Sequence, residues 1–235
     1  MAERHTKKGV ALSNVTGIVF DCDGTLLDSM GAWRGLERDL AREVNIELTA
    51  EDVDALNVMT IPEVGDYYFQ KFGLGASGND VVEMIDTYMA EHYGTLSVLR
   101  PGVKSFVEQM AEHGIKMSVA SSTPHHLLEI ALGAVGLAPY LEAIVSVDDV
   151  GHSKREPHTF DAAREAMGTS LDNTVVFEDS LYAVHTALKA GYKTVGIYDC
   201  DEAGTWDDLE GAAHVTFRSF EDIDANRFIS GGYWV

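Results

Sequence analysis

Short apolar runs separated by helical patterns constrain the fold of this chain most strongly. The runs are apolar on both faces, which is typical of strands covered on two sides in a parallel sheet. They are Ile18–Phe20, Met117–Ala120, Ile144–Val147, Val175–Phe177 and Val195–Ile197. Helical patterns occupy Val103–His113, Pro124–Val135, Pro157–Met167 and Leu181–Ala190. The alternation predicts an α/β fold with a doubly wound, mostly parallel, Rossmann-like sheet.

A segment from about Met30 to Ser97 interrupts this alternation. It shows only helical periodicity, in Trp33–Val44, Ala50–Leu56, Pro62–Phe72 and Asp80–Tyr93. We therefore predict an α/β core domain of residues 1–29 and 98–235 and an inserted α-helical cap domain of residues 30–97. An insertion placed directly after the first strand is expected to lie over the carboxyl end of that strand.

The charge balance excludes one class of partner. Lysine and arginine number 17 against 38 aspartate and glutamate residues, a net charge of −21 that would repel a nucleic acid. No run approaches the roughly 20 apolar residues that cross a bilayer, and two cysteines are too few for a disulfide framework. We expect a cytoplasmic protein with no membrane or nucleic-acid partner. The acidic stretch Asp199–Glu210 is expected to be a solvated surface loop.

Two acidic residues follow the first apolar run. Asp21 ends the run and Asp23 comes two residues later, so both carboxylates point to the same side if the extended conformation continues. Gly24 then permits a sharp turn. Two like charges repel unless one is protonated or a cation such as magnesium lies between them. Taken alone, the segment is equally well explained as an acidic turn at a strand end.

Polar side chains also follow three of the other predicted strands. They are Ser121-Ser122-Thr123, then Lys154, which comes after a strand and a loop, and Glu178-Asp179. The carboxyl ends of parallel strands meet at one edge of a sheet, where ligands bind, so these groups should converge on one crevice. Each has a plainer explanation alone, since serine, threonine and acidic residues cap helices and lysines are mostly solvated. Their joint occurrence at successive strand ends favours a binding site for an anion and a metal ion.

With these residues in place, the chain resembles the haloacid dehalogenase superfamily, in the branch with a helical cap after the first motif. The four matching motifs are Asp21-Cys22-Asp23-Gly24-Thr25, Ser121, Lys154 and Glu178-Asp179. The resemblance spans nearly the whole chain. The usual Lys-Pro-x-Pro of the third motif stands here as Lys154-Arg155-Glu156-Pro157, which lacks the first proline.

The resemblance implies a magnesium-dependent phosphatase that hydrolyses a small phosphorylated metabolite, a phosphate monoester, through an aspartyl phosphate. It makes Asp21 the nucleophile and Asp23 the general acid and base. It assigns the metal to the Asp21 carboxylate, the Asp23 backbone carbonyl and Asp179, with Glu178 bound directly or through water. The phosphate oxygens would be held by Ser121 and Lys154, together with backbone N–H groups around Cys22, Gly24 and Ser122.

Other reactions of the superfamily fit less well. Dehalogenases lack the second aspartate and phosphonate hydrolases replace it, so Asp23 counts against both. β-Phosphoglucomutases keep both aspartates but typically carry a histidine where Trp33 stands, which leaves a hexose-phosphate mutase as the alternative. A phospho-accepting or phosphate-binding signalling module is the alternative that is not an enzyme, although the size of the helical insertion counts against it.

Substrate selection would fall to the cap. Trp33 and Arg34 are candidates for lining the pocket, although packing of the indole and solvation of the guanidinium are the commoner roles. No pair of histidines shows a convincing metal spacing, so zinc is not expected.

Overall fold

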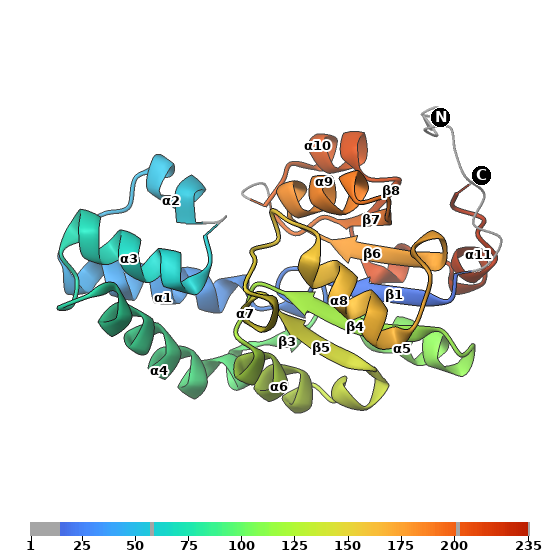
Figure 1. The fold of residues 1–235 in the computed structure, drawn as a ribbon, viewed down its shortest axis with the longest axis horizontal. Coiled ribbons are helices and arrows are strands. Elements are labelled where there is room, and N and C mark those ends of the chain that lie inside the picture. The colour runs from blue at the N-terminus through green and yellow to red at the C-terminus, as the bar shows by residue number, and fades with distance from the viewer. Residues whose placement is uncertain (1–14, 57–58, 201–202, 235) are drawn as a thin grey trace.

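A parallel sheet of six strands forms the centre of the molecule (Figure 1). The structure is a computed structural model that describes residues 15–56, 59–200 and 203–234. The strand order is β5-β4-β1-β6-β7-β8. The strands are β1 (Gly17–Phe20), β4 (Lys116–Ser121), β5 (Ala143–Ser146), β6 (Thr174–Glu178), β7 (Lys193–Ile197) and β8 (Val215–Phe217). The predicted α/β fold with a doubly wound parallel sheet is confirmed.

Helices cover both faces of this sheet. Ile18 and Phe20 of β1 pack with Phe106 of α5 on one face, whereas Val19 packs with Phe160 of α8 on the other. Because both faces are buried, the strands are continuously apolar. The helices of the core are α5 (Val103–Glu112), α6 (His125–Ala134), α7 (Val147–Val150), α8 (His158–Met167), α9 (Leu181–Lys189), α10 (Trp206–Ala212) and α11 (Ala225–Ile229), with single 3₁₀ turns at Ala138–Tyr140, Leu171–Asn173 and Phe220–Asp222.

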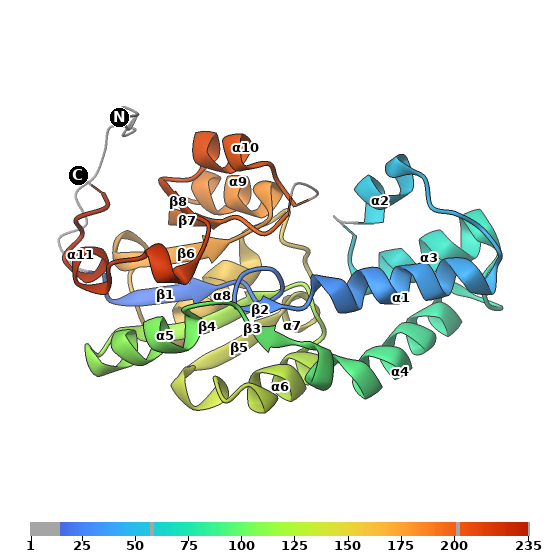
Figure 2. The same ribbon diagram turned by 180° about the vertical axis from the view of Figure 1, so that it is seen from behind.

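Four further helices lie beyond the carboxyl ends of the strands (Figures 1 and 2). They stand in the chain between β2 (Leu27–Asp28) and β3 (Val98–Leu99), which pair as a short antiparallel ribbon. These helices are α1 (Met30–Glu43), α2 (Ala50–Leu56), α3 (Ile61–Phe72) and α4 (Gly78–Leu96). The chain therefore leaves the sheet region after β2 and returns at β3. Pairing of β2 with β3 holds the outgoing and the returning segments side by side. No helix among the described residues is long and apolar enough to cross a membrane.

Capping residues explain where the structure departs from the predicted boundaries. The strand predicted to end at Val147 ends at Ser146, whose hydroxyl accepts from the backbone N–H of Asp148 at 3.2 Å and begins α7. The expectation of a solvated loop over 199–210 is wrong in part, because α10 begins at Trp206. Thr205 caps this helix by accepting from the N–H of Asp208 at 3.2 Å. Acidic residues in a first turn also favour the helix dipole.

Candidate active site

The turn after β1 brings the backbone of Gly24 against the carboxylate of Asp179. Asp21 follows β1 directly and is buried, and its N–H donates to the carbonyl of Phe177 in β6 at 2.9 Å. Gly24 has a φ of 82°, and its N–H donates to the carbonyl of Leu27 at 2.8 Å. A Cβ at Gly24 would clash with Oδ2 of Asp179. Glycine is thus required twice, for the left-handed conformation and for the close approach to Asp179.

Asp21 meets the other predicted acidic pair and the predicted lysine at this point. Lys154 is 2% exposed, and its Nζ donates to Asp21 and, at 2.7 Å, to Oε1 of Glu178. Carboxylate oxygens of Asp21, Glu178 and Asp179 all lie within 4.8 Å of one another. Three buried carboxylates therefore face one buried ammonium group.

Burial makes the excess negative charge of this cluster costly. Burial raises the pKa of Asp21, which the Lys154 ammonium partly offsets and the Glu178 charge reinforces. Burial likewise raises the pKa of Asp179, and the charges of Asp21 and Glu178 raise it further. Burial acts to lower the pKa of Lys154, but the charges of Asp21 and Glu178 prevail and hold it above its ordinary value. A divalent cation at this cluster would relieve the repulsion among the carboxylates.

The oxygen atoms of the cluster fit magnesium. Oδ2 of Asp21 is buried and has no hydrogen-bond partner among the described residues. An unpartnered buried carboxylate oxygen is costly unless a cation or a bound ligand compensates it. Magnesium prefers oxygen ligands and binds through one or two carboxylates together with substrate phosphate and water. Asp21, Glu178 and Asp179 offer carboxylate oxygens of that kind, and Asp179 lies against Gly24.

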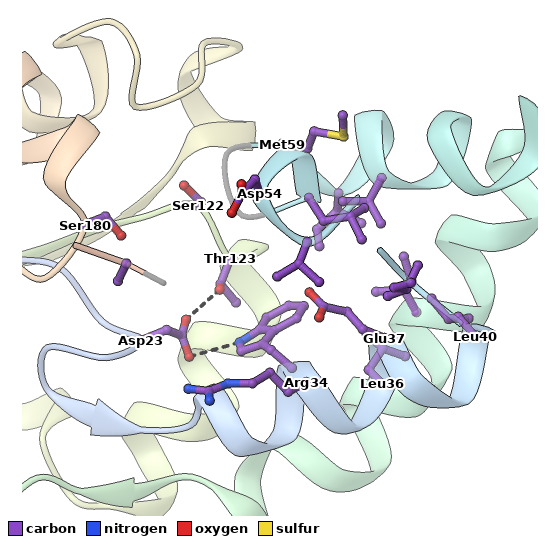
Figure 3. A pocket seen from close by; sticks show the side chains of 18 of the residues that line it. Asp23, Arg34, Leu36, Glu37, Leu40, Asp54, Met59, Ser122, Thr123 and Ser180 are labelled. Atoms are coloured by element: carbon purple, nitrogen blue, oxygen red, sulfur yellow. Dashed lines mark hydrogen bonds between the residues drawn. The ribbon is translucent and has the colours of Figure 1, made fainter. Parts of the chain in front are cut away.

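The carboxylate of Asp23 has different surroundings from that of Asp21. Its Oδ2 accepts from Thr123 Oγ1 at 2.7 Å (Figure 3), and its Oδ1 accepts from Trp33 Nε1 at 3.2 Å. The hydroxyl groups of Ser29 and Tyr93 also donate to Oδ1. Trp33 belongs to α1 and Tyr93 to α4, so two of the four donors come from the inserted helices. The group of potential metal-ligating carboxylates consists of Asp21, Glu178 and Asp179 and does not include the Asp23 carboxylate.

The segment after β4 completes the polar wall of the site. Ser121 is buried, and its Oγ accepts from the N–H of Thr123 at 3.1 Å.

Burial raises the pKa of Tyr182, at the start of α9, to about 12, and the charge of Lys154 opposes this shift. Cys22 is fully buried, and burial raises the pKa of its thiol. Both groups are therefore neutral at physiological pH.

A pocket of about 1240 Å³ connects these groups to the inserted helices. Predicted residues that line it from the sheet side are Asp21, Asp23, Ser121, Ser122, Lys154, Glu178 and Asp179. Trp33 and Arg34, the two predicted residues of α1, line it from the inserted helices together with Glu37. Figure 3 shows Arg34 and Glu37 on this helix. The pocket thus lies between the sheet and the inserted helices, and both parts of the chain supply polar groups to it.

Sequence reasoning missed two polar groups of the site, Tyr93 and Tyr182, which the sequence places only within helical patterns. Thr123 belongs to the predicted group of hydroxyls after the second strand, but its contact with Asp23 was not predicted. Nothing in the sequence links Tyr93 to Asp23, because they are 70 residues apart and the contact depends on how α4 packs.

Known proteins share both the sequence pattern and the fold. A family model described as haloacid dehalogenase-like hydrolase matches residues 18–197. Hexitol phosphatase B of Escherichia coli (strain K12) is 25% identical over 183 residues, which are 77% of this chain and 82% of that protein. Fructose-1-phosphate phosphatase YqaB of the same strain is 27% identical over 189 residues, 77% of this chain and 95% of that protein. A crystal structure of β-phosphoglucomutase from Clostridium difficile has the same fold, with a TM-score of 0.77 and 18% identity. The match covers 93% of this chain and 97% of that chain.

Proposed function

Because the chain belongs to the haloacid dehalogenase-like hydrolase family, we propose that it is a magnesium-dependent phosphatase that hydrolyses a small-molecule phosphate monoester through an aspartyl phosphate. One observation carries this proposal: a buried carboxylate, Asp21, stands at the tip of β1 with one oxygen bound by Lys154 and the other without a hydrogen-bond partner among the described residues. The free oxygen is the nucleophile.

The reaction has two displacement steps at phosphorus. Oδ2 of Asp21 attacks the phosphoryl group, the bond to the ester oxygen breaks, and Asp23 donates a proton to the departing alkoxide. Asp23 then removes a proton from water, which attacks the aspartyl phosphate and releases inorganic phosphate and the Asp21 carboxylate. Four donors hold the Asp23 carboxylate at the pocket, where it can reach the leaving oxygen.

Positive charge and hydrogen-bond donors would hold the phosphoryl oxygens. Lys154 and the Ser121 hydroxyl supply two contacts, and the backbone N–H groups around Cys22, Gly24 and Ser122 supply the rest. When bound, magnesium would lie between the carboxylates of Asp21 and Asp179 and the carbonyl of Asp23, with Glu178 as a direct or water-mediated ligand, and would neutralise charge on the phosphoryl group.

Residues 30–97 act in this proposal as a cap domain that selects the substrate, and residues 1–29 and 98–235 act as the core domain. Residues 1–14 of that core lie outside the described residues. Arg34 and Glu37 give the cap side of the pocket charged groups that suit a hydroxyl-rich substrate. The relatives named for hexitol and fructose-1-phosphate hydrolysis favour phosphates of sugars or sugar alcohols.

The mutase alternative has less support. Transfer back to a bound sugar needs a group at the cap that can exchange a proton with the sugar, and Trp33 has no basic nitrogen. Instead its Nε1–H donates to Asp23. Incubation with β-glucose 1-phosphate separates the two reactions: release of inorganic phosphate indicates hydrolysis, and formation of glucose 6-phosphate without release indicates a mutase.

Phosphate release from a panel of sugar and sugar-alcohol phosphates, with magnesium and with a chelator, tests the proposal. Asp21→Asn should lower the rate by at least about 10³-fold, because the amide is not a nucleophile. The control is Asp39→Asn, which removes an exposed carboxylate of α1 that pairs with Arg42. Turnover close to that of wild type in a folded Asp21→Asn variant would contradict the proposal. So would rates of phosphate release by wild type that are the same with magnesium and with a chelator.

A further inference from the structure

A second group of metal-ligating side chains lies on the surface, in the segment between α7 and α8. The group consists of His152, Glu156 and His158, one potential ligand atom of each lying within 4.8 Å of the other two. All three side chains are about half exposed, so an ion can reach them from solvent. Sequence spacing did not indicate this site, because the turn ending at Pro157 is what brings the two imidazoles together.

The two nitrogen–oxygen separations within this group are close to the spacing of neighbouring ligands in a transition-metal site. Nδ1 of His152 lies 3.2 Å from Oε1 of Glu156, and Nε2 of His158 lies 3.3 Å from Oε2 of the same carboxylate. Zinc binds imidazole and carboxylate at about 2.0–2.2 Å, which places neighbouring ligands of a tetrahedral site about 3.3–3.6 Å apart. The centroids of the two imidazole rings are 4.2 Å apart. Small side-chain rotations would therefore suffice to close the group around one ion.

The cationic side chains in the same segment point elsewhere. Lys154 is buried and binds Asp21 and Glu178, on the inner side of the segment. Nη1 of Arg155 lies 3.8 Å from Oε1 of Glu63 in α3. The ammonium and guanidinium groups are thus engaged with other carboxylates, and the net charge of −21 draws cations toward the protein.

We propose that His152, Glu156 and His158 bind one transition-metal ion of the zinc, nickel or copper class. Two imidazole nitrogens and one carboxylate suit such an ion and leave a coordination position for water, whereas the oxygen-only cluster at Asp21 suits magnesium. The two sites therefore differ in the class of metal that they select. In the sequence, Lys154 lies between the proposed ligands His152 and Glu156. A bound ion would therefore also restrict the movement of the segment that carries this lysine relative to the first turn of α8.

Zinc binding to the full-length, tag-free protein in excess magnesium tests the proposal. We expect one equivalent to bind competitively with a chromogenic chelator, and His152→Gln and His158→Gln each to weaken that binding by at least about tenfold. Zinc should raise the Tm of wild type and should raise it less in both variants, because a ligand of the folded state stabilises it. Circular dichroism checks that the variants are folded.

His125→Gln is the matched control. His125 is an exposed histidine with two carboxylate neighbours, but Asp149 lies 2.8 Å from its Nδ1 and Glu129 lies 3.8 Å from its Nε2. The two carboxylates lie on opposite sides of the imidazole ring, so they cannot bind the same metal ion together with His125. This variant should therefore bind zinc as wild type does.

Copper(II) gives a second measurement that identifies the ligands. Its electron paramagnetic resonance spectrum should show coupling to imidazole nitrogen in wild type and to fewer nitrogens in either variant. Copper bound at the all-oxygen cluster of Asp21, Glu178 and Asp179 cannot produce this nitrogen coupling. Zinc affinity that is unchanged in both variants, zinc binding lost equally in the control, or a copper spectrum without nitrogen coupling would overturn the proposal. None of these results depends on phosphatase activity, so they leave the proposed function unaffected.

Discussion

Asp21 and Asp23 are chemically identical, two residues apart and line the same pocket, yet their carboxylates have different hydrogen-bond partners. Lys154 and two further carboxylates surround Asp21. Hydroxyl groups and an indole N–H surround Asp23, and all of them donate to it. The first environment fits the proposed nucleophile beside a cation. The second holds the Asp23 carboxylate in one position at the pocket, as its proposed role requires.

The turn at Gly24 can be tested by a single methyl group. Gly24→Ala adds a Cβ that clashes with Asp179, so we expect phosphate release to fall by at least about tenfold through displacement of that carboxylate. Steady-state kinetics and magnesium titration measure the loss. The backbone penalty of about 1–2 kcal/mol at positive φ is present as well.

Gly114→Ala is the control for that backbone penalty. Gly114 has a φ of 71°, close to the value at Gly24, and an added Cβ there meets no atom within 4 Å. Its alanine variant should lose stability but keep wild-type activity. Equal activity in the two variants would show that the approach of Gly24 to Asp179 is unimportant.

At the scale of the elements, α1 and α4 hold the proposed general acid and base. Tyr93 of α4 is fully buried, and burial together with the charge of Asp23 raises the pKa of its hydroxyl, which therefore remains a donor. Its ring packs edge-on against Trp33 of α1, with ring centroids 5.9 Å apart. The position of Asp23 is thus tied to the packing of two cap helices.

Tyr93→Phe removes the hydroxyl donor and keeps the ring. We expect kcat to fall about tenfold with little change in KM, because one of the four hydrogen bonds that position the Asp23 carboxylate is lost while the pocket keeps its shape. Tyr88→Phe in the same helix is the control, since within the described part of the chain its hydroxyl makes no hydrogen bond to the site, and its ring stacks on His92. A change confined to KM would contradict a positioning role for Tyr93.

Helices α2 and α3 are joined through a buried carboxylate. Asp52 accepts hydrogen bonds from Lys71, from Thr49 and, at 2.6 Å, from the Tyr67 hydroxyl. These bonds hold the pKa of Asp52 well below its usual range. The unfolded chain therefore takes up a proton at a higher pH than the folded chain does. The stabilisation is complete above the unfolded pKa of about 3.9 and is lost as the pH falls below it.

Asp52→Asn should reproduce that pH dependence. We expect the variant to have a lower free energy of unfolding than wild type at pH 7, and the difference to shrink as the pH is lowered below about 4. Urea denaturation at several pH values measures it. Glu51→Gln, an exposed substitution on the same helix, should give a small difference that lacks this trend. A difference that grows in acid would show that the sign is wrong.

At the scale of the whole molecule, the net charge of −21 opposes the approach of an anionic substrate. Raising potassium chloride from about 10 to about 150 mM shortens the Debye length from about 30 to about 8 Å. With magnesium saturating, we expect KM for a phosphate monoester to fall severalfold, whereas kcat changes little because the positive groups that hold the bound phosphate are local. A KM that rises steadily over this range would contradict the argument.

The sequence alone determined the main architecture and the acidic and basic residues of the site. Strands buried on both faces leave continuous apolar runs, and the polar residues directly after β1, β4 and β6 must lie at one edge of a parallel sheet. Strand β8 was missed because its three residues are only half buried at the edge of the sheet, so no apolar run marks it. Helix α10 was missed because its acidic first turn resembles a solvated loop.

Only the tertiary structure decided which side chains meet across long stretches of chain. The direction of the Asp23 carboxylate depends on Tyr93, and the grouping of His152 with His158 depends on the turn between them. Periodicity and spacing report what a residue's immediate neighbours require, which is enough to define strands, helices and strand ends. They do not report the packing angle of α4 or the path of a turn, and these set the partners of a carboxylate or an imidazole.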